Sequence, residues 1–378
     1  MKKIQMVDLQ SQYQNIKSEV DAAIINVIEQ ANFINGPEVS SFRSDLEKYL
    51  KVAHVIPCAN GTDALQIALM SLDLKPGDEV ITPSFTYIAT TEVIALLGLT
   101  PVFVDVLPNT FCIDPSKIEE AITDKTKVIV PVHLYGQCAD MDPILAIAKK
   151  YNLKVVEDTA QAIGADYTHE DGRVSKAGTM GDIGCTSFFP SKNLGCYGDG
   201  GAMYTNDIHL AASLKKIANH GQVIKYHHEV VGCNSRLDTI QAAILKIKLP
   251  LLDGYCSARQ KVAEYYNHAF AELKQITTPF KAPNTTHVYH QYTIKLSGVD
   301  RKELIEYLNS HGIPSMIYYP LPAHKQGMFK SFGKENQDLP ITNQLTECVL
   351  SLPIHTEMEQ EQLEYITKHV IHFIKSFA

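Results

Sequence analysis

The chain has 378 residues, 45% of them apolar and 20% charged, the balance of a globular protein long enough for two domains. Its 34 basic and 42 acidic residues give a net charge of −8, so it offers no basic field for a nucleic-acid backbone. No apolar run reaches membrane-spanning length, and no apolar segment follows the N-terminal lysines as a secretory signal requires. We therefore expect a cytoplasmic protein that binds neither nucleic acid nor membrane.

From residue 54 to about residue 205, short apolar runs alternate with segments of helical periodicity. Strands are predicted at 54–57, 79–82, 101–106, 128–132 and 154–156. The predicted helices between them include Leu65 to Leu72, 87–97, 115–122 and 143–151. This alternation favours an α/β domain with a mostly parallel, buried sheet.

After this region the pattern changes. A long helical segment, 237–273, is predicted to break near Pro250 and Gly254. It is followed by predicted strands and helices at 289–296, 301–311, 315–319 and a final helix that carries Leu363, Ile366, Val370 and Phe373. The change indicates a large domain over residues 1–250 and a smaller α+β domain over residues 251–378.

Several common kinds of site lack support in the sequence. The eight cysteines include no Cys-x-x-Cys pair, and the histidine pairs have no second ligand cluster at zinc spacing, so no metal site is predicted. Neither a Gly-x-Gly-x-x-Gly nor a Gly-x-x-x-x-Gly-Lys-Ser/Thr motif is present. The sequence therefore contains no motif that supports a dinucleotide-dependent or P-loop enzyme.

Three polar clusters, 60–63, 157–161 and 187–192, follow strand-like runs. In a parallel sheet, ligands bind beyond the carboxyl ends of the strands, so we expect these clusters to converge. The third contains Lys192, which stands between an apolar run and the glycine-rich stretch 195–201. A desolvated lysine has a lowered pKa and can act as a nucleophilic amine. A solvated loop lysine is the other interpretation, and this segment alone does not separate the two.

Asp158 ends a predicted strand, 34 residues before Lys192. Its carboxylate could pair with a protonated pyridine nitrogen, or it could cap a helix or bind a ribose. Gly61 and Thr62 could bind a phosphate at a helix N-terminus, although a simple helix cap is commoner there. Taken together and in this order, a phosphate cradle, a strand-end acid and a lysine indicate a fold-type-I pyridoxal-phosphate enzyme.

The chain resembles the sugar aminotransferases of the DegT/DnrJ/EryC1/StrS family over almost its whole length. The ordered matching segments are FINGPE (33–38), ANGTDAL (59–65), GDEVITP (77–83), FTY (85–87), VHLYGQ (132–137), EDTAQ (157–161), SFFPSK (187–192) and NSRLD (234–238). This resemblance implies an aspartate-aminotransferase-like fold in which residues 1–250 bind pyridoxal 5'-phosphate.

The resemblance also implies a role for each matching residue. Lys192 would hold the cofactor as a Schiff base and move a proton between substrate and cofactor, and Asp158 would hold the pyridine nitrogen. Gln161 would contact the oxygen side of the ring, and Tyr87 would stack on its face. The phosphate would be bound by Gly61, Thr62, Ser187 and, from the neighbouring subunit of a homodimer, Asn234.

The segments 134–140, 195–202 and 220–228 resemble most those relatives that aminate C3 of a UDP-linked 3-keto-N-acetylglucosaminuronate. This implies transfer from an amino acid, L-glutamate by resemblance, to a nucleotide sugar of the kind used in lipopolysaccharide and O-antigen biosynthesis. The candidate substrate residues are Arg236, His227, Tyr318 and Tyr319.

Three alternatives stay open at this point. Tyr318 departs from the His-Tyr-Pro pattern of the nearest relatives, which leaves a dTDP-linked keto-deoxysugar as a second substrate class. A sugar dehydratase of the same fold is a weaker alternative, because those relatives carry histidine where this chain has Lys192. A non-catalytic homologue is disfavoured because Lys192, Asp158 and Thr62 are all retained. The sequence does not determine the keto sugar, the reacting carbon, the nucleotide, the amino donor or any assembly beyond a dimer.

Overall fold

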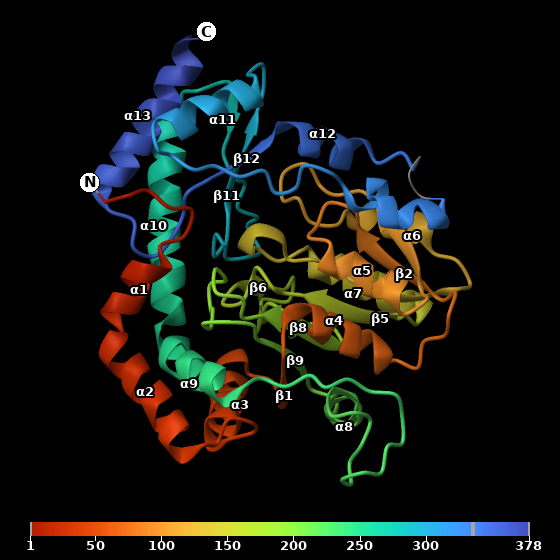
Figure 1. The fold of residues 1–378 in the computed structure, drawn as a ribbon. Helices are drawn as coiled ribbons and strands as arrows, with labels where there is room; N and C mark the ends of the chain where they lie inside the picture. Colours follow the sequence, from red (N-terminus) through yellow and green to blue (C-terminus); the bar gives the residue numbers. More distant parts are fainter. Residues whose placement is uncertain (1, 334–336, 377–378) are drawn as a thin grey trace.

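The computed structural model describes residues 2–333 and 337–376. Its centre is a seven-stranded sheet with strand order β1-β9-β8-β5-β4-β2-β3 (Figure 1). The four contacts from β3 to β8 are parallel, whereas β9 runs antiparallel to both of its neighbours. The expected α/β fold with a mostly parallel sheet is therefore confirmed. The strands are β1 (His54–Cys58), β2 (Glu79–Pro83), β3 (Thr100–Val104), β4 (Thr126–Ile129), β5 (Lys154–Asp158), β8 (Ile183–Ser187) and β9 (Gly201–Thr205).

Helices cover both faces of this sheet, which is why its strands read as continuous apolar runs. Consecutive residues of β5 show the arrangement: Val155 packs in one hydrophobic core and Val156 in another. The Val155 core includes residues of α3 (Pro37–Leu50), α6 (Pro115–Ala121), α7 (Met141–Tyr151) and α9 (Thr239–Lys248). The Val156 core includes residues of α4 (Gly61–Met70), α5 (Ala89–Leu96) and α8 (Ile208–Ala218).

A smaller unit with a hydrophobic core of its own is built on an antiparallel sheet of β10 (Ile276–Thr277), β11 (Tyr292–Leu296) and β12 (Val349–Leu352). Its core joins this sheet to α10 (Leu252–Phe270), α11 (Arg301–Ser310) and α13 (Gln360–Ser376). Ile4, near the start of the chain, packs in the same core.

Apart from short 3-10 turns, the remaining helices and strands are α1 (Leu9–Asn15), α2 (Lys17–Gln30), α12 (Pro340–Cys348) and the hairpin of β6 (Asp166–Thr168) and β7 (Val174–Lys176).

Two details of the sequence prediction are wrong. Gly254 does not break a helix: only Pro250 lies in a break, a 3-10 turn at 249–251, and Gly254 then lies inside α10. Residues 315–319 form no strand, apart from an isolated bridge of Met316 to Ser351. Met316 exchanges backbone hydrogen bonds with Ser351 of β12, whereas the carbonyl of Tyr318 accepts a hydrogen bond from the Tyr135 hydroxyl. No helix among the described residues is both long and apolar enough to cross a bilayer.

Candidate active site

A cavity of about 630 Å³ lies where the parallel strands end. Asp158 is the last residue of β5 and Ser187 is the last residue of β8, and both line the cavity. The loop after β2 brings Tyr87 to the same cavity. The polar clusters expected to converge at the carboxyl edge of the sheet do so here. Nine of the twelve predicted site residues line this cavity, namely Gly61, Thr62, Tyr87, Asp158, Gln161, Ser187, Lys192, Tyr318 and Tyr319.

Lys192 lies in the connection between β8 and β9, with its backbone amide bonded to the carbonyl of Phe189 at 2.8 Å. Tight packing shapes this turn, since a β-carbon on Gly195 would lie 2.3 Å from the carbonyl oxygen of Pro190. Within the described chain, the Lys192 amine makes no hydrogen bond or ion pair. Burial lowers its pKa to about 8, against a smaller opposing effect of Asp158. The amine is therefore available for covalent chemistry.

Asp158 is buried at the cavity wall, and both of its carboxylate oxygens accept hydrogen bonds. Oδ2 accepts from the hydroxyl of Thr90 at 2.7 Å, and Oδ1 accepts from the backbone amide of Ala160 at 3.1 Å. Thr90 lies in the first turn of α5, and a second hydroxyl, that of Thr86, lies 3.1 Å from it. These contacts hold the carboxylate in one orientation inside the cavity.

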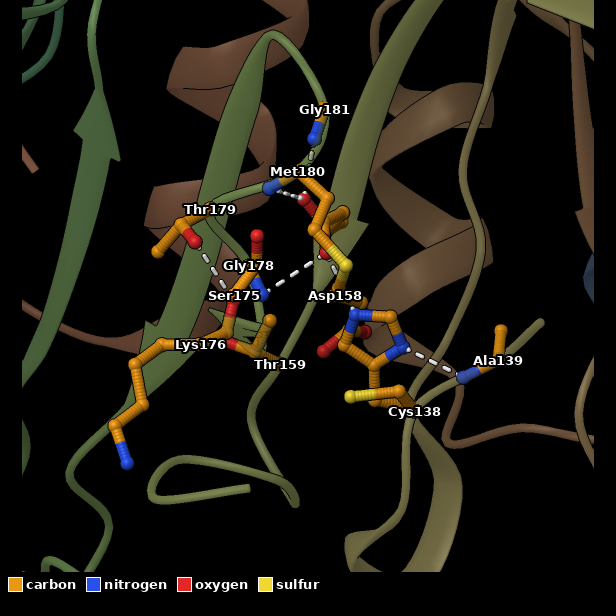
Figure 2. A network of polar contacts seen from close by, with 12 residues as sticks. Cys138, Ala139, Asp158, Thr159, Ser175, Lys176, Gly178, Thr179, Met180 and Gly181 are labelled. Carbon is orange, nitrogen blue, oxygen red and sulfur yellow. Dashed lines mark hydrogen bonds and ion pairs between the residues drawn. The ribbon is translucent and has the colours of Figure 1, made fainter. Parts of the chain in front are cut away.

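Glu157, which precedes Asp158 in the chain, forms a fully buried pair with His133, with 2.8 Å between His133 Nε2 and Glu157 Oε2. Figure 2 shows the polar network around this pair, including Ala139, Asp158 and the turn of Gly178, Met180 and Gly181. Because His133 Nδ1 accepts a hydrogen bond from the amide of Ala139, Nε2 carries the proton and donates to the carboxylate. Glu157 also accepts hydrogen bonds from the amides of Gly178, Met180 and Gly181. The carboxylate thus joins the end of β5 to the turn before β8.

The backbone of Asp158 is fixed by the same neighbourhood. Its amide donates to the carbonyl of Pro131 at 2.9 Å, and its carbonyl accepts from the amide of His133 at 3.0 Å. On the other side, the amide of Thr159 donates to the carbonyl of Cys185 at 2.8 Å. Hydrogen bonds to the 131–133 segment and to β8 therefore fix the position at which Asp158 leaves the sheet.

The N-terminus of α4 faces the cavity through Gly61 and Thr62. Asn60 caps this helix, accepting a hydrogen bond from the amide of Asp63 at 2.8 Å. Gly61 is required by packing, because a β-carbon there would lie 2.7 Å from the β-carbon of Ser187. Backbone amides at a helix N-terminus, together with the hydroxyls of Thr62 and Ser187, make an arrangement suited to an anion.

Gln161 makes hydrogen bonds to two tyrosines. Its Oε1 accepts from the amide of Tyr135 at 2.9 Å, and its Nε2 donates to the hydroxyl of Tyr319 at 3.0 Å. The rings of Tyr87 and Tyr319 lie 6.1 Å apart. Tyr87 is 56% exposed, although it borders the cavity, so its ring face is available for a planar ligand.

Comparison with known proteins agrees with this geometry. The profile of the DegT/DnrJ/EryC1/StrS aminotransferase family matches residues 14–371. This chain belongs to that family.

Relatives and solved structures match it over nearly the whole chain. A UDP-2-acetamido-2-deoxy-3-oxo-D-glucuronate aminotransferase from Pseudomonas aeruginosa is 46% identical over 96% of this chain and 98% of its own. A dTDP-3-amino-3,4,6-trideoxy-alpha-D-glucose transaminase from Streptomyces venezuelae is 39% identical over 95% of this chain and 93% of its own. The crystal structure of DesV from S. venezuelae in complex with a ketimine intermediate superposes with a TM-score of 0.94, at 38% identity, and covers 99% of both chains.

Three predicted residues of this DegT/DnrJ/EryC1/StrS aminotransferase do not line the main cavity. Asn234 and Arg236 line a neighbouring cavity of about 350 Å³, and Asp199 borders both cavities. His227 lines none of the described cavities and is exposed in the segment 222–232. That segment extends outward beyond α8 in Figure 1. Within one subunit these residues are therefore not brought together with Lys192.

The structure also adds residues that the sequence did not single out. Thr90 contacts Asp158 directly, and Asp199 and His290 line the main cavity. Only the spacing of Thr90 on a helix that follows β2 could have suggested its position. No group of three or more histidine, cysteine, aspartate or glutamate side chains suited to a metal occurs among the described residues.

Proposed function

We propose that this protein is a pyridoxal-phosphate-dependent aminotransferase that transfers an amino group from an amino acid to a nucleotide-linked keto sugar. The observation that carries the proposal is the cavity in which an unpartnered amine, a fixed carboxylate and a helix N-terminus face one another. Membership of the aminotransferase family supports it. When bound, pyridoxal phosphate acts as an electron sink for negative charge on the substrate carbon.

The chain's own residues fit that cofactor. Lys192 has an amine free to attach to an aldehyde and, when released, to move a proton at Nζ. Asp158 would keep a proton on the ring nitrogen, since its carboxylate is held by two donors and faces the cavity. The N-terminus of α4, with Thr62 and Ser187, would bind the phosphate. Gln161 would contact the oxygen side of the ring.

The active unit is proposed to be a homodimer that shares its sites. Asn234 and Arg236 lie beside the main cavity rather than in it, and Asp199 connects the two cavities. The adjoining segment exposes apolar side chains, including Ile224 and Val231, as expected of a surface that a second copy covers. In such a dimer Asn234 would reach the phosphate bound by the neighbouring subunit.

The proposed acceptor is a UDP-linked 3-keto sugar of the N-acetylglucosaminuronate type, and the proposed donor is L-glutamate. The Pseudomonas aeruginosa relative, described as acting on such a sugar, supports this acceptor. Arg236 and His227 are the candidate partners of the uronate carboxylate, while Tyr318 and Tyr319 would border the sugar. The Streptomyces venezuelae relative keeps a dTDP-linked keto-deoxysugar as the second candidate. Localisation in the cytoplasm, where nucleotide sugars are made, belongs to the same proposal.

Covalent trapping tests the reaction class. Protein purified with pyridoxal phosphate should absorb visible light, and borohydride should fix the cofactor on the peptide that contains Lys192. Lys248 is an internal comparison, because burial lowers its pKa to about 8 as well, yet it lies outside the cavity and donates to the carbonyl of Gly195. Label on Lys248 or on any lysine other than Lys192 would refute the proposed assignment.

A spectral titration tests the acceptor. UDP-linked 3-amino sugars with and without the C6 carboxylate, and their dTDP counterparts, would be added to the holoenzyme. A response confined to the UDP-linked uronate is expected. An equal response to the neutral sugar, or a response to dTDP sugars alone, would refute the acceptor while leaving the aminotransferase proposal intact.

A further inference from the structure

His290 stands in the wall of the active-site cavity with Lys192, and none of the roles above includes it. Its side chain is buried, at 5% exposure. Within the described residues neither of its ring nitrogens makes a hydrogen bond, and Nδ1 is fully enclosed. An unpaired buried polar atom is destabilising. The His290 ring, which lines the same cavity as the Lys192 amine, is therefore available for a hydrogen bond to a partner that is present during only part of the reaction.

The imidazole of His290 is neutral at physiological pH. Burial, and then the positive charges of Lys192 and Arg259, hold its pKa well below the ordinary value. A neutral imidazole has one nitrogen that accepts a hydrogen bond, whereas an imidazolium has none. His290 can therefore accept a hydrogen bond from a cation in this cavity.

The backbone of His290 is held by an unusual group. Arg259, only 3% exposed, donates from Nη1 to the carbonyl oxygens of Tyr289, His290 and Ile354 at 3.2, 3.3 and 3.1 Å. Among the described residues it has no carboxylate partner, and burial lowers its pKa to about 10. A buried cation without a carboxylate partner lowers the stability of the folded state. Arg259 has this cost, and its three hydrogen bonds fix the backbone of the segment.

The same segment is tied to the neighbour of Lys192. The side-chain amide of Asn193 donates to the carbonyl of Val288 at 3.0 Å. The amide of Val288 donates in turn to the carbonyl of Gly136 at 2.7 Å. The peptide that carries Lys192 and the peptide that carries His290 are therefore fixed relative to each other.

We propose that His290 is a positioning residue for Lys192, whose amine donates a hydrogen bond to the neutral imidazole in the holoenzyme once Lys192 has been released from the bound cofactor. Lys192 takes a proton from the substrate carbon at Nζ and later returns it, and His290 gains and loses no proton. The imidazole holds Nζ in line with that carbon. The inference rests on the proposed function, because it assigns Lys192 the proton transfer.

His287 provides a matched control three residues away. It is as deeply buried and as neutral, since burial lowers its pKa to about 3. Its Nδ1 nevertheless has a partner, the amide of Tyr289 at 3.0 Å, and its ring stacks on Tyr289 at 3.9 Å. It does not line the cavity. Loss of His287 should affect packing without affecting Lys192.

The first test is single-turnover reaction of the holoenzyme with L-glutamate carrying hydrogen or deuterium at C2. His290→Phe should slow the reaction about 10- to 100-fold, part of the usual contribution of acid–base groups, and raise the deuterium isotope effect. His290→Asn, which retains a hydrogen-bond acceptor, should recover much of the rate. His287→Asn should leave the isotope effect unchanged. An unchanged rate and isotope effect in His290→Phe would overturn the proposal; if that variant does not fold, His290→Ala gives the same readouts.

The second test uses the pyridoxamine form of the holoenzyme, in which Lys192 is not attached to the cofactor. In that form, the pH dependence of chemical labelling at Lys192 reports the pKa of its amine. A neutral acceptor stabilises the ammonium, so His290→Phe should lower this pKa by about half a unit or more, and His290→Asn should lower it less. An unchanged midpoint would count against the contact. Borohydride mapping of the unsubstituted protein separates the two ideas, since absence of label on Lys192 refutes the proposed function itself.

Discussion

The surroundings of Asp158 and the segment around Asn234 were both predicted to serve one site, yet the structure builds them differently. Around Asp158, each carboxylate oxygen of Asp158 and of its neighbour Glu157 accepts at least one hydrogen bond from the same chain. Around Asn234, the chain borders a separate cavity and continues into a segment where Val231 is 84% exposed. One half of the proposed site is therefore built within a single subunit, whereas the other half is proposed to need a second copy of the chain.

The largest expected effect concerns the self-contained half. Lys192→Ala removes the amine that would hold the cofactor and move the proton, and turnover should fall by about 10⁴-fold or more. Steady-state assay with L-glutamate and a UDP-linked keto sugar measures it. Activity within tenfold of the unsubstituted protein would show that this half of the cavity is not the reaction centre.

Next comes the charge of Asp158. Asp158→Asn keeps the shape but no longer favours a protonated ring nitrogen, so turnover should fall about 10²- to 10³-fold, the usual loss for one such interaction. Thr90→Val removes only the hydrogen bond to Oδ2 and should cost about tenfold. Equal losses in the two variants would mean that position, not charge, is what Asp158 contributes.

A smaller effect on turnover, but a larger one on stability, is expected at Glu157. Glu157→Gln faces four donors with one acceptor, so the free energy of unfolding should fall by about 3 kcal/mol, measured by urea denaturation. Glu119→Gln, which breaks an exposed pair with Lys150, should cost less than about 1 kcal/mol. A stable Glu157→Gln protein would show that the Asp158 region is less tightly determined than its hydrogen bonds indicate.

The smallest effect belongs to the second half of the site. Asn234→Ala should weaken pyridoxal-phosphate binding by about tenfold, the value of one hydrogen bond to a charged group. The loss should depend on protein concentration, because in the proposed dimer Asn234 contacts the phosphate of the neighbouring subunit. Mixed dimers of Lys192→Ala and Asn234→Ala chains should regain intact sites. Absence of recovery in subunits shown to exchange would place both halves within one subunit.

Much of the large unit could be predicted because its strands are buried on both faces. Short apolar pairs such as Val80 and Ile81 or Val155 and Val156 mark the buried strands, and these strands alternate with helical segments along the chain. Strand β8 was predicted only as a strand-like run before the 187–192 cluster, without bounds, because Gly184, Cys185 and Thr186 carry little apolar surface of their own. Its burial comes from neighbouring strands and helices, which sequence periodicity does not report.

The site divides in the same way. Residues in motifs, such as Lys192 and Gln161, could be assigned because a resemblance places them. Thr90 and His290 could not, because their importance arises from contacts with residues far away in the chain: 68 positions separate Thr90 from Asp158. The strand expected at 315–319 failed for a related reason, since the carbonyl of Tyr318 bonds to Tyr135 rather than to a neighbouring strand.

The packing of Ile4 has a consequence for biosynthesis. Ile4 shares its core with Ile366 of α13, and the carbonyl of Met6 accepts a hydrogen bond from the amide of Ile354. The core around Ile4 is therefore completed by residues that are synthesised much later in the chain. Until α13 has been translated, the apolar surface of α10 and β11 stays uncovered in the nascent chain. Chaperone binding during translation should concentrate on this half-formed core, while the large sheet can already have folded.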